Sequence, residues 1–297
     1  MDNILQEPQY EWGGKWTETK LDAFAKYVFS YLTIMNKHPY WKTIYFDGFA
    51  GSGERKEKCN SSLYHTLLLT EQEDRLYKGA AERVLSLQNN LSFDYYYFID
   101  RNEDSLKKLE VKLSDLQNTK KNPFQFRSGD CNQYLNELSK AMNTKESKYA
   151  ALVLLDPFGM QIDWDSIASL KNTKTDIWIL IPTGVIVNRL LDKSCNLKHS
   201  VKLQRFFGLS EDEIKQYFYS KENLYTLFGE EEIVKKVNKP IEKIADLYAL
   251  RLKTIWKHVT EKPLSLFNSK GVPIFHFVFA SNNQTALKIA NQIIKSI

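Results

Sequence analysis

The first 182 residues contain five apolar runs, and the first four of these runs end in an aspartate. The runs are KTIYFD (42–47), DYYYFID (94–100), FQFRSGD (124–130), YAALVLLD (149–156) and TDIWILIP (175–182). Helical stretches between the runs give the alternation that is typical of a mostly parallel sheet with helices on both faces. ALVLL and IWILI contain no polar residue, as expected of central strands buried on both sides. The pattern predicts an α/β fold.

The loop after the first predicted strand is unusually rich in glycine. YFDGFAGSG (45–53) holds Gly48, Gly51 and Gly53, three of only 12 glycines in 297 residues. Glycines at 51 and 53 remove Cβ atoms that would keep a ligand away from the main chain, and they permit positive φ where the chain reverses. The loop therefore predicts a cofactor that lies against the backbone.

Acidic residues close four successive predicted strands. Ligands of open parallel sheets bind at the carboxyl ends of the strands. One aspartate at such a position is most simply a helix N-cap, but four beside a glycine loop favour a binding site. Asp100 is placed to accept hydrogen bonds from a ribose, and Asp130 from an adenine amino group. The predicted site thus combines Asp47, Asp100, Asp130 and Asp156.

The details of the loop argue against a dinucleotide. No third glycine follows Gly53, and Glu54 would repel a pyrophosphate. Asp100 also lies more than twice as far from Gly53 as the roughly 20 positions of a nicotinamide-binding fingerprint. A nicotinamide-dependent dehydrogenase is therefore the weakest of three hypotheses. A cofactor without a pyrophosphate, S-adenosylmethionine, fits the loop better.

The amino-acid composition limits which classes of protein this chain can belong to. The chain is 43% hydrophobic and 26% charged, with a net charge of +5 that permits a nucleic-acid partner without requiring one. The three cysteines are isolated and no HExxH motif occurs, so neither a disulfide framework nor a metal site is expected. The N-terminus lacks a signal-peptide pattern, and no apolar run reaches the ~18 residues of a membrane span. We expect a cytoplasmic protein that does not insert into membranes.

Several motifs together resemble a known family. DGFAGSG resembles the FxGxG loop of adenosylmethionine-dependent amino-methyltransferases, with Phe49, Gly51 and Gly53 on the pattern. With WTETKL, the GD.N stretch at 129–132, LLDPFG and PTG, residues 16 to about 184 resemble the three-Cys-motif partner proteins, a bacterial family. The resemblance implies a Rossmann-like class I methyltransferase fold with a seven-stranded sheet, cofactor contacts at Asp47, Gly48 and Phe49, and a protein partner that carries a cysteine motif.

The turn after the fourth strand bears on the reaction. Amino-methyltransferases that act on bases use a D/N-P-P-aromatic turn, whose polar side chain accepts from the target amine while the aromatic ring stacks on a flipped base. Here the turn is Asp156, Pro157, Phe158, Gly159, without the second proline. Two hypotheses follow. The chain is a methyltransferase for an amino group of nucleic acid, or it is a catalytically degenerate partner subunit that acts through protein contacts.

The remaining sequence predicts a three-part organisation. Residues 1–184 form the cofactor-binding core, residues 185–257 a wholly helical insertion, and residues 258–297 an antiparallel hairpin and a helix that complete the core. EEEIVKKVNKPIEK (230–243) is interpreted as a solvated helix broken at Pro240. Further helices are expected over 61–72 and 79–88. Lys20, in the first helix, is interpreted most simply as a solvated lysine, although it could meet a carboxylate.

Overall fold

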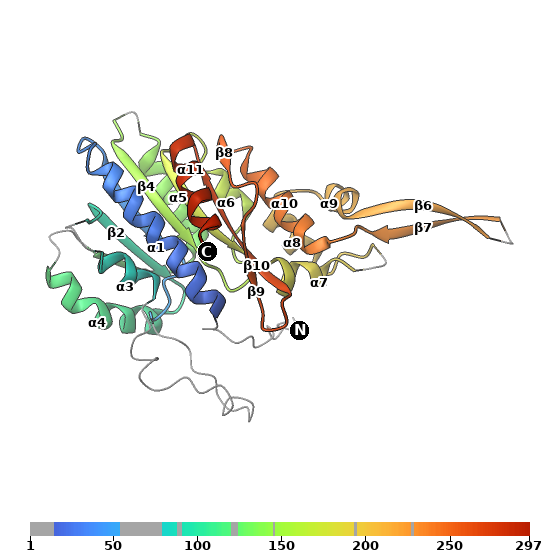
Figure 1. Cartoon of the computed structure of the whole chain (residues 1–297), viewed down its shortest axis with the longest axis horizontal. Coiled ribbons are helices and arrows are strands. Elements are labelled where there is room, and N and C mark those ends of the chain that lie inside the picture. Colours follow the sequence, from blue (N-terminus) through green and yellow to red (C-terminus); the bar gives the residue numbers. More distant parts are fainter. Residues whose placement is uncertain are drawn as a thin grey trace, which may run out of the picture.

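The body of the protein is a mixed β-sheet with helices on both faces (Figure 1). The computed structural model describes residues 15–53, 79–87, 91–119, 124–144, 146–192, 195–226 and 229–297, so the helix predicted over 61–72 lies outside the described residues. The parallel part consists of β1 (Lys42–Asp47), β2 (Tyr95–Asp100), β3 (Phe124–Ser128), β4 (Tyr149–Leu155) and β5 (Thr175–Ile181). All five apolar runs of the sequence are thus strands.

The strand order identifies the fold. Seven strands follow the order β3-β2-β1-β4-β5-β10-β8, in which β10 (Pro273–Ser281) runs antiparallel between β5 and β8 (His258–Val259). An eighth strand, β9 (Leu264–Phe267), forms the predicted hairpin with β10. This order, with its switch point between β1 and β4 and its reversed penultimate strand, defines the class I methyltransferase fold. The predicted fold class is therefore confirmed.

Two apolar layers hold helices against the sheet. One layer involves α1 (Lys15–Met35), α3 (Ala80–Leu85), α4 (Glu103–Thr119) and α11 (Gln284–Lys295), and the other α5 (Cys131–Met142), α6 (Trp164–Ala168) and α10 (Pro240–Leu252). Alternation within β1 feeds both layers, because Tyr45 belongs to the first and Ile44 and Phe46 to the second. None of the helices in the described residues is long and apolar enough to cross a membrane.

The insertion differs from the prediction. It contains a π-helical turn, η2 (Thr183–Val187), and the helices α7 (Asn188–Leu190), α8 (Ser200–Phe207) and α9 (Glu211–Phe218), as expected. It also contains a two-stranded hairpin, β6 (Tyr219–Thr226) and β7 (Gly229–Lys236), where a solvated helix had been predicted. The expectation of a wholly helical insertion is wrong for this part. Tyr219, Tyr225, Ile233 and Val234 favour strands, and Gly229 favours a turn. The domain boundaries themselves stay a prediction.

Candidate functional site

The glycine loop packs against the end of β2. Gly51 and Gly53 have φ angles of 60° and 68°, which residues other than glycine rarely adopt. The Gly51 N–H donates to Asp100 Oδ2 over 2.9 Å. A Cβ on Gly53 would lie 2.8 Å from Leu109 Cδ1, whereas a Cβ on Gly51 would meet nothing within 4 Å. Gly53 thus permits packing on α4, whereas no described atom crowds the position of a Cβ on Gly51.

Gly48 has a different function from the one predicted for the loop as a whole. A Cβ there would lie 2.5 Å from Cys131 Sγ and 2.7 Å from Leu155 Cδ2. The residue is buried, and its N–H donates to the Leu154 carbonyl over 3.0 Å. Its lack of a side chain lets β1, β4 and α5 approach one another. The contact that Gly48 and Phe49 were predicted to make with a cofactor stays a prediction.

Asp47 is a carboxyl group held inside the protein. It is 2% exposed and accepts hydrogen bonds from the Tyr45 hydroxyl (3.0 Å) and the Phe49 N–H (3.3 Å). Burial raises the pKa of Asp47 to about 7, and the charges of Asp156 and Asp100 act in the same direction. The two hydrogen bonds do not offset this. Asp47 therefore changes charge near neutral pH, at the inner end of the glycine loop.

Asp100 is fixed by the backbone around it. Its Oδ2 atom accepts from Gly51 and its Oδ1 atom accepts from the Asn102 N–H over 2.8 Å. The carboxylate is half-buried, and each oxygen keeps a second lone pair. The arrangement holds an acceptor at the end of β2 in one orientation, next to the Gly51 backbone.

Lys20 and Asp156 form a pair that connects α1 with the end of β4. Lys20 is 3% exposed, its ammonium donates to Asp156 Oδ2, and it also lies 5.4 Å from the centre of the Trp16 ring. The expectation of a solvated Lys20 is wrong. The helix carries Trp16, Lys20, Phe24 and Val28 at intervals of four, so Lys20 falls within the apolar stripe that packs on the sheet. That spacing was the signal in the sequence.

The second carboxylate oxygen of Asp156 is unusual. Asp156 Oδ1 is buried and accepts no hydrogen bond from any described residue. The following Pro157 is buried, and Phe158 is half-buried with its N–H donating to Gln161 Oε1 over 3.0 Å. Buried polar atoms without a partner are rare in folded proteins. Asp156 Oδ1 is thus an acceptor at the carboxyl end of β4 for which the described residues supply no donor.

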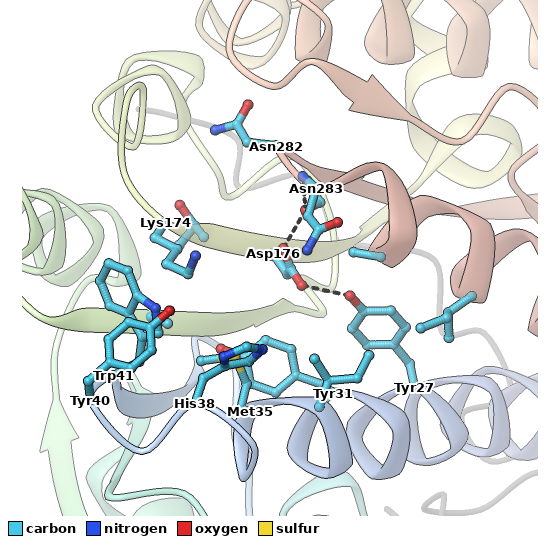
Figure 2. A pocket seen from close by; sticks show the side chains of 16 residues that line it. Tyr27, Tyr31, Met35, His38, Tyr40, Trp41, Lys174, Asp176, Asn282 and Asn283 are labelled. Carbon is cyan, nitrogen blue, oxygen red and sulfur yellow. Dashed lines mark hydrogen bonds between the residues drawn. The ribbon is translucent and has the colours of Figure 1, made fainter.

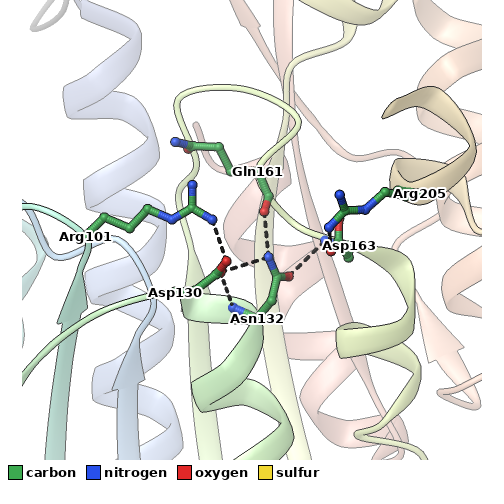
Figure 3. A network of polar contacts seen from close by, with 6 residues as sticks. All are labelled: Arg101, Asp130, Asn132, Gln161, Asp163 and Arg205. Atoms are coloured by element: carbon green, nitrogen blue, oxygen red, sulfur yellow. Dashed lines mark hydrogen bonds and ion pairs between the residues drawn. The ribbon is translucent and has the colours of Figure 1, made fainter. Parts of the chain in front are cut away.

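Asp130 lies on the same rim but is already engaged (Figure 3). It caps α5 by accepting from the Asn132 N–H over 2.9 Å, and it pairs with Arg101 over 2.5 Å. Burial raises the pKa of Asp130, but the Asn132 hydrogen bonds and the Arg101 guanidinium outweigh it, so the pKa lies below its usual value. The adenine contact predicted for Asp130 would have to be added to these bonds.

The Asn132 amide ties three elements together (Figure 3). Its Nδ2 atom donates to the Gln161 carbonyl over 2.9 Å, and its Oδ1 atom accepts from the Asp163 N–H over 2.9 Å. Asp163 in turn pairs with Arg205 of α8. The network fixes the loop after β4 to α5 and to the insertion. The sequence analysis singled out Asn132 only as part of a motif and missed this bridge.

A cavity of about 250 Å³ lies at the other edge of the sheet (Figure 2). It opens where β4 and β5 begin, between α1 and α11, and Tyr31, Trp41 and Lys174 are among its lining residues. Asp176 accepts there from the Tyr27 hydroxyl (2.6 Å) and from Ser281 Oγ (2.5 Å). None of the predicted site residues lines this cavity. It is separate from the rim at the carboxyl ends of the strands.

No protein-family model and no curated protein matches the chain. Similar solved structures include protein LPL1258 of Legionella pneumophila, described by the family model DUF519 (14% identity, 92% of this chain and 98% of that chain covered, TM-score 0.42). Another is DszA carbon methyltransferase (13% identity, 88% of this chain and 54% of that chain covered, TM-score 0.41). A third is a Pyrococcus horikoshii protein described as a candidate RNA methyltransferase (12% identity, 70% of this chain and 81% of that chain covered, TM-score 0.26).

The fold assignment rests on the strand order, and the chain has the fold of the class I methyltransferases. No particular family within that class is identified. The resemblance to the three-Cys-motif partner proteins therefore stays a prediction.

Proposed function

We propose that the chain is an S-adenosylmethionine-dependent methyltransferase that acts on an amino group of nucleic acid. The observation that carries the proposal is the Asp156 carboxylate. Lys20 holds its Oδ2 atom, whereas its Oδ1 atom is buried and has no donor among the described residues. An incoming amine has the N–H that would supply the missing bond, and leaving such an acceptor unsatisfied costs about 1 to 3 kcal/mol.

The cofactor would lie along the glycine loop. Its methionine end would lie at Gly51, where no described atom crowds a Cβ, and Asp100 presents oriented oxygens for ribose hydroxyls. Asp130 has lone pairs left for an adenine amino group beside its bonds to Arg101 and Asn132. When bound, S-adenosylmethionine supplies an electrophilic methyl group.

The chain's own residues would orient the acceptor. A hydrogen bond from the amine to Asp156 Oδ1 directs the nitrogen lone pair, and Lys20 fixes the carboxylate and compensates its charge. The half-buried Phe158 ring offers a face for a base. Arg101 and Arg205, 60% and 65% exposed, lie at the rim, where guanidinium groups suit phosphates. These features favour nucleic acid as the substrate class.

Calorimetric titration with S-adenosylmethionine tests the cofactor. We expect binding to the wild type and a loss of at least about tenfold in affinity for Asp100→Ala, because a fixed acceptor is removed. Asp104→Ala, an exposed acid four positions further along, is the matched control and should bind as the wild type does. Absence of binding to the wild type, or equal binding by Asp100→Ala, contradicts the proposal.

Transfer of a tritiated methyl group tests the reaction. DNA, RNA and protein are offered in parallel, and Asp156→Ala should lose transfer while it retains cofactor binding. Labelling of protein alone would contradict the nucleic-acid assignment.

A catalytically degenerate partner subunit is the second candidate, because the turn lacks the second proline and Gln161 holds the Phe158 N–H. Cofactor binding without transfer to any acceptor would favour it.

A further inference from the structure

The hairpin of β6 and β7 projects away from the rest of the molecule along its longest axis (Figure 1). Its base is anchored, because the Tyr219 hydroxyl donates to the Asp192 carbonyl (2.6 Å) and Lys236 Nζ to the carbonyls of Asn188 (3.0 Å) and Leu191 (2.7 Å). Further out, Glu222, Asn223 and Glu230 are exposed, and Tyr225 is 77% exposed. The hairpin is an arm that carries little of the core.

The arm leaves strand edges without partners. Among the described strands, β6 and β7 pair only with each other. The outer edge of each strand is therefore not covered by another described strand. A two-stranded ribbon by itself is marginally stable in water, and a third or fourth strand would stabilise it. The open edge identifies where a partner strand would add.

The sequence of β7, GEEEIVKK (229–236), has acidic residues in its first half and basic residues at its end, so its charges complement those of an antiparallel copy. An antiparallel pair of β7 strands related by a two-fold axis at Ile233 places position 231 opposite 235 and position 230 opposite 236. Each of these pairs a glutamate with a lysine. Opposed residues share one face of a sheet, so these pairs are in reach of each other.

The register is selective. The N–H and C=O groups of a strand point alternately to its two edges, so only residues an even number apart are opposed when a strand pairs with its own copy. With the two-fold axis at Val234, only positions 232 and 236 pair a glutamate with a lysine. With the axis at Glu232, no such pair forms. The register at Ile233 therefore has the most favourable charges.

We propose that β7 pairs with β7 of a second copy of this chain in that register, so that the two arms form one four-stranded sheet. Lys236 already donates to carbonyls of the body. The pair of position 231 with Lys235 of the second copy is therefore the one that a charge substitution can test. Lys235 bonds Glu222 over 2.5 Å in its own hairpin. The partner is a copy of the chain, since the edge complements itself.

Sedimentation velocity of the full-length chain over a range of concentrations tests the proposal. The wild type should sediment as a dimer. Lys235→Glu and Glu231→Lys each place like charges opposite each other twice, so each should raise the dissociation constant by about tenfold or more. An equimolar mixture of the two variants should dimerise again, because glutamate then faces lysine at both positions.

The mixture also separates association from damage within one arm, since Lys235→Glu loses its own bond to Glu222. Lys202→Glu, the same charge change at an exposed site on α8, is the control and should dimerise as the wild type does. A monomeric wild type, a dimer that both charge variants leave intact, or a mixture that does not reassociate would each overturn the proposal.

Discussion

Asp47 is a buried carboxyl group whose surroundings disfavour its charged form. It lies at the end of β1 among Tyr45, Asp100 and Asp156, in surroundings that disfavour its charge. A cationic ligand beside it would reverse that preference, because an opposite charge stabilises the carboxylate. A buried acid that is costly without a ligand and useful with one is typical of a binding site.

Asp47→Asn is expected to stabilise the protein at alkaline pH. The folded-state pKa of about 7 exceeds the ordinary value of 3.8, so the folded state retains a proton that the unfolded state loses. The free energy of unfolding therefore falls as pH rises from about 4 to 7, by up to about 4 kcal/mol, and asparagine removes this loss. Urea denaturation at pH 5 and pH 8 measures it. Exposed Asp104→Asn is the control, and an equal effect of Asp47→Asn at both pH values would refute the explanation.

His276 should act in the opposite direction. It is 4% exposed, its Nδ1 atom lies 2.8 Å from Thr183 Oγ1, and burial lowers its pKa from 6.5 to about 4. The unfolded state then binds a proton more readily, so the free energy of unfolding falls as pH drops from 6.5 to 4, by up to about 3 kcal/mol. His276→Gln should flatten this acid limb in thermal melts between pH 4 and 7. An unchanged limb would assign the acid sensitivity to other groups.

The residues at strand ends could be predicted because local rules place them. Asp47, Asp100 and Asp156 each follow an apolar run, and Gly51 adopts the positive φ that a reversal requires. The partners of those residues could not be predicted in the same way. Lys20 reaches Asp156 across 136 positions, and Asn132 reaches Asp163 across 31. Such contacts depend on how helices lie on the sheet, which no local pattern encodes.

At the scale of elements, one arginine joins three helices. Arg251 of α10 donates from Nε to the Phe207 carbonyl (2.9 Å) and from Nη2 to the Gly208 carbonyl (3.0 Å), at the end of α8. Its guanidinium lies 4.6 Å from the centre of the Trp164 ring of α6. The cation thus satisfies carbonyls that a helix end leaves without donors. The insertion is attached to the body at this point.

Arg251→Lys should destabilise the protein by about 1 to 2 kcal/mol. Lysine keeps the charge, but its single ammonium cannot reach both carbonyls and stack on Trp164 at once. Urea denaturation should show a lower midpoint with an unchanged m-value. Lys253→Arg, an exposed exchange on the same chain segment, should leave the midpoint in place. Loss of stability in both variants would point to a general effect of the exchange.

The elements were predicted unequally. Apolar runs such as ALVLL identify strands because burial on both faces leaves a strong signal. The arm lacked that signal, since Glu222, Glu230 and Lys235 are exposed and a charged ribbon resembles a charged helix in composition. The β-branched pair Ile233 and Val234 and the turn at Gly229 were the remaining indications of a hairpin.

At the scale of the whole molecule, the arm should be separable from the body. Replacing residues 221–234 by Asn-Gly would join Ser220 to Lys235, which are opposed in the hairpin, and would keep the anchored Tyr219 and Lys236. We expect a melting temperature within about 2 °C of the wild type, because most of the described side chains in the removed part are exposed. Circular dichroism measures the melting temperature, and sedimentation should show a monomer. A fall of about 10 °C would show that the arm supports the core.

The place of β10 between β5 and β8 also affects how the protein is made. Asp176 at the start of β5 waits for Ser281, 105 positions later, and Trp178 for Phe277 and Phe279. While a ribosome builds the insertion, β5 is an apolar strand with one bare edge. At about 5 to 20 residues per second, synthesis of the residues between β5 and β10 takes roughly 5 to 20 seconds. During this time nascent chains can associate through the unpaired edge of β5. A chaperone that covers that edge during synthesis would raise the yield of folded protein.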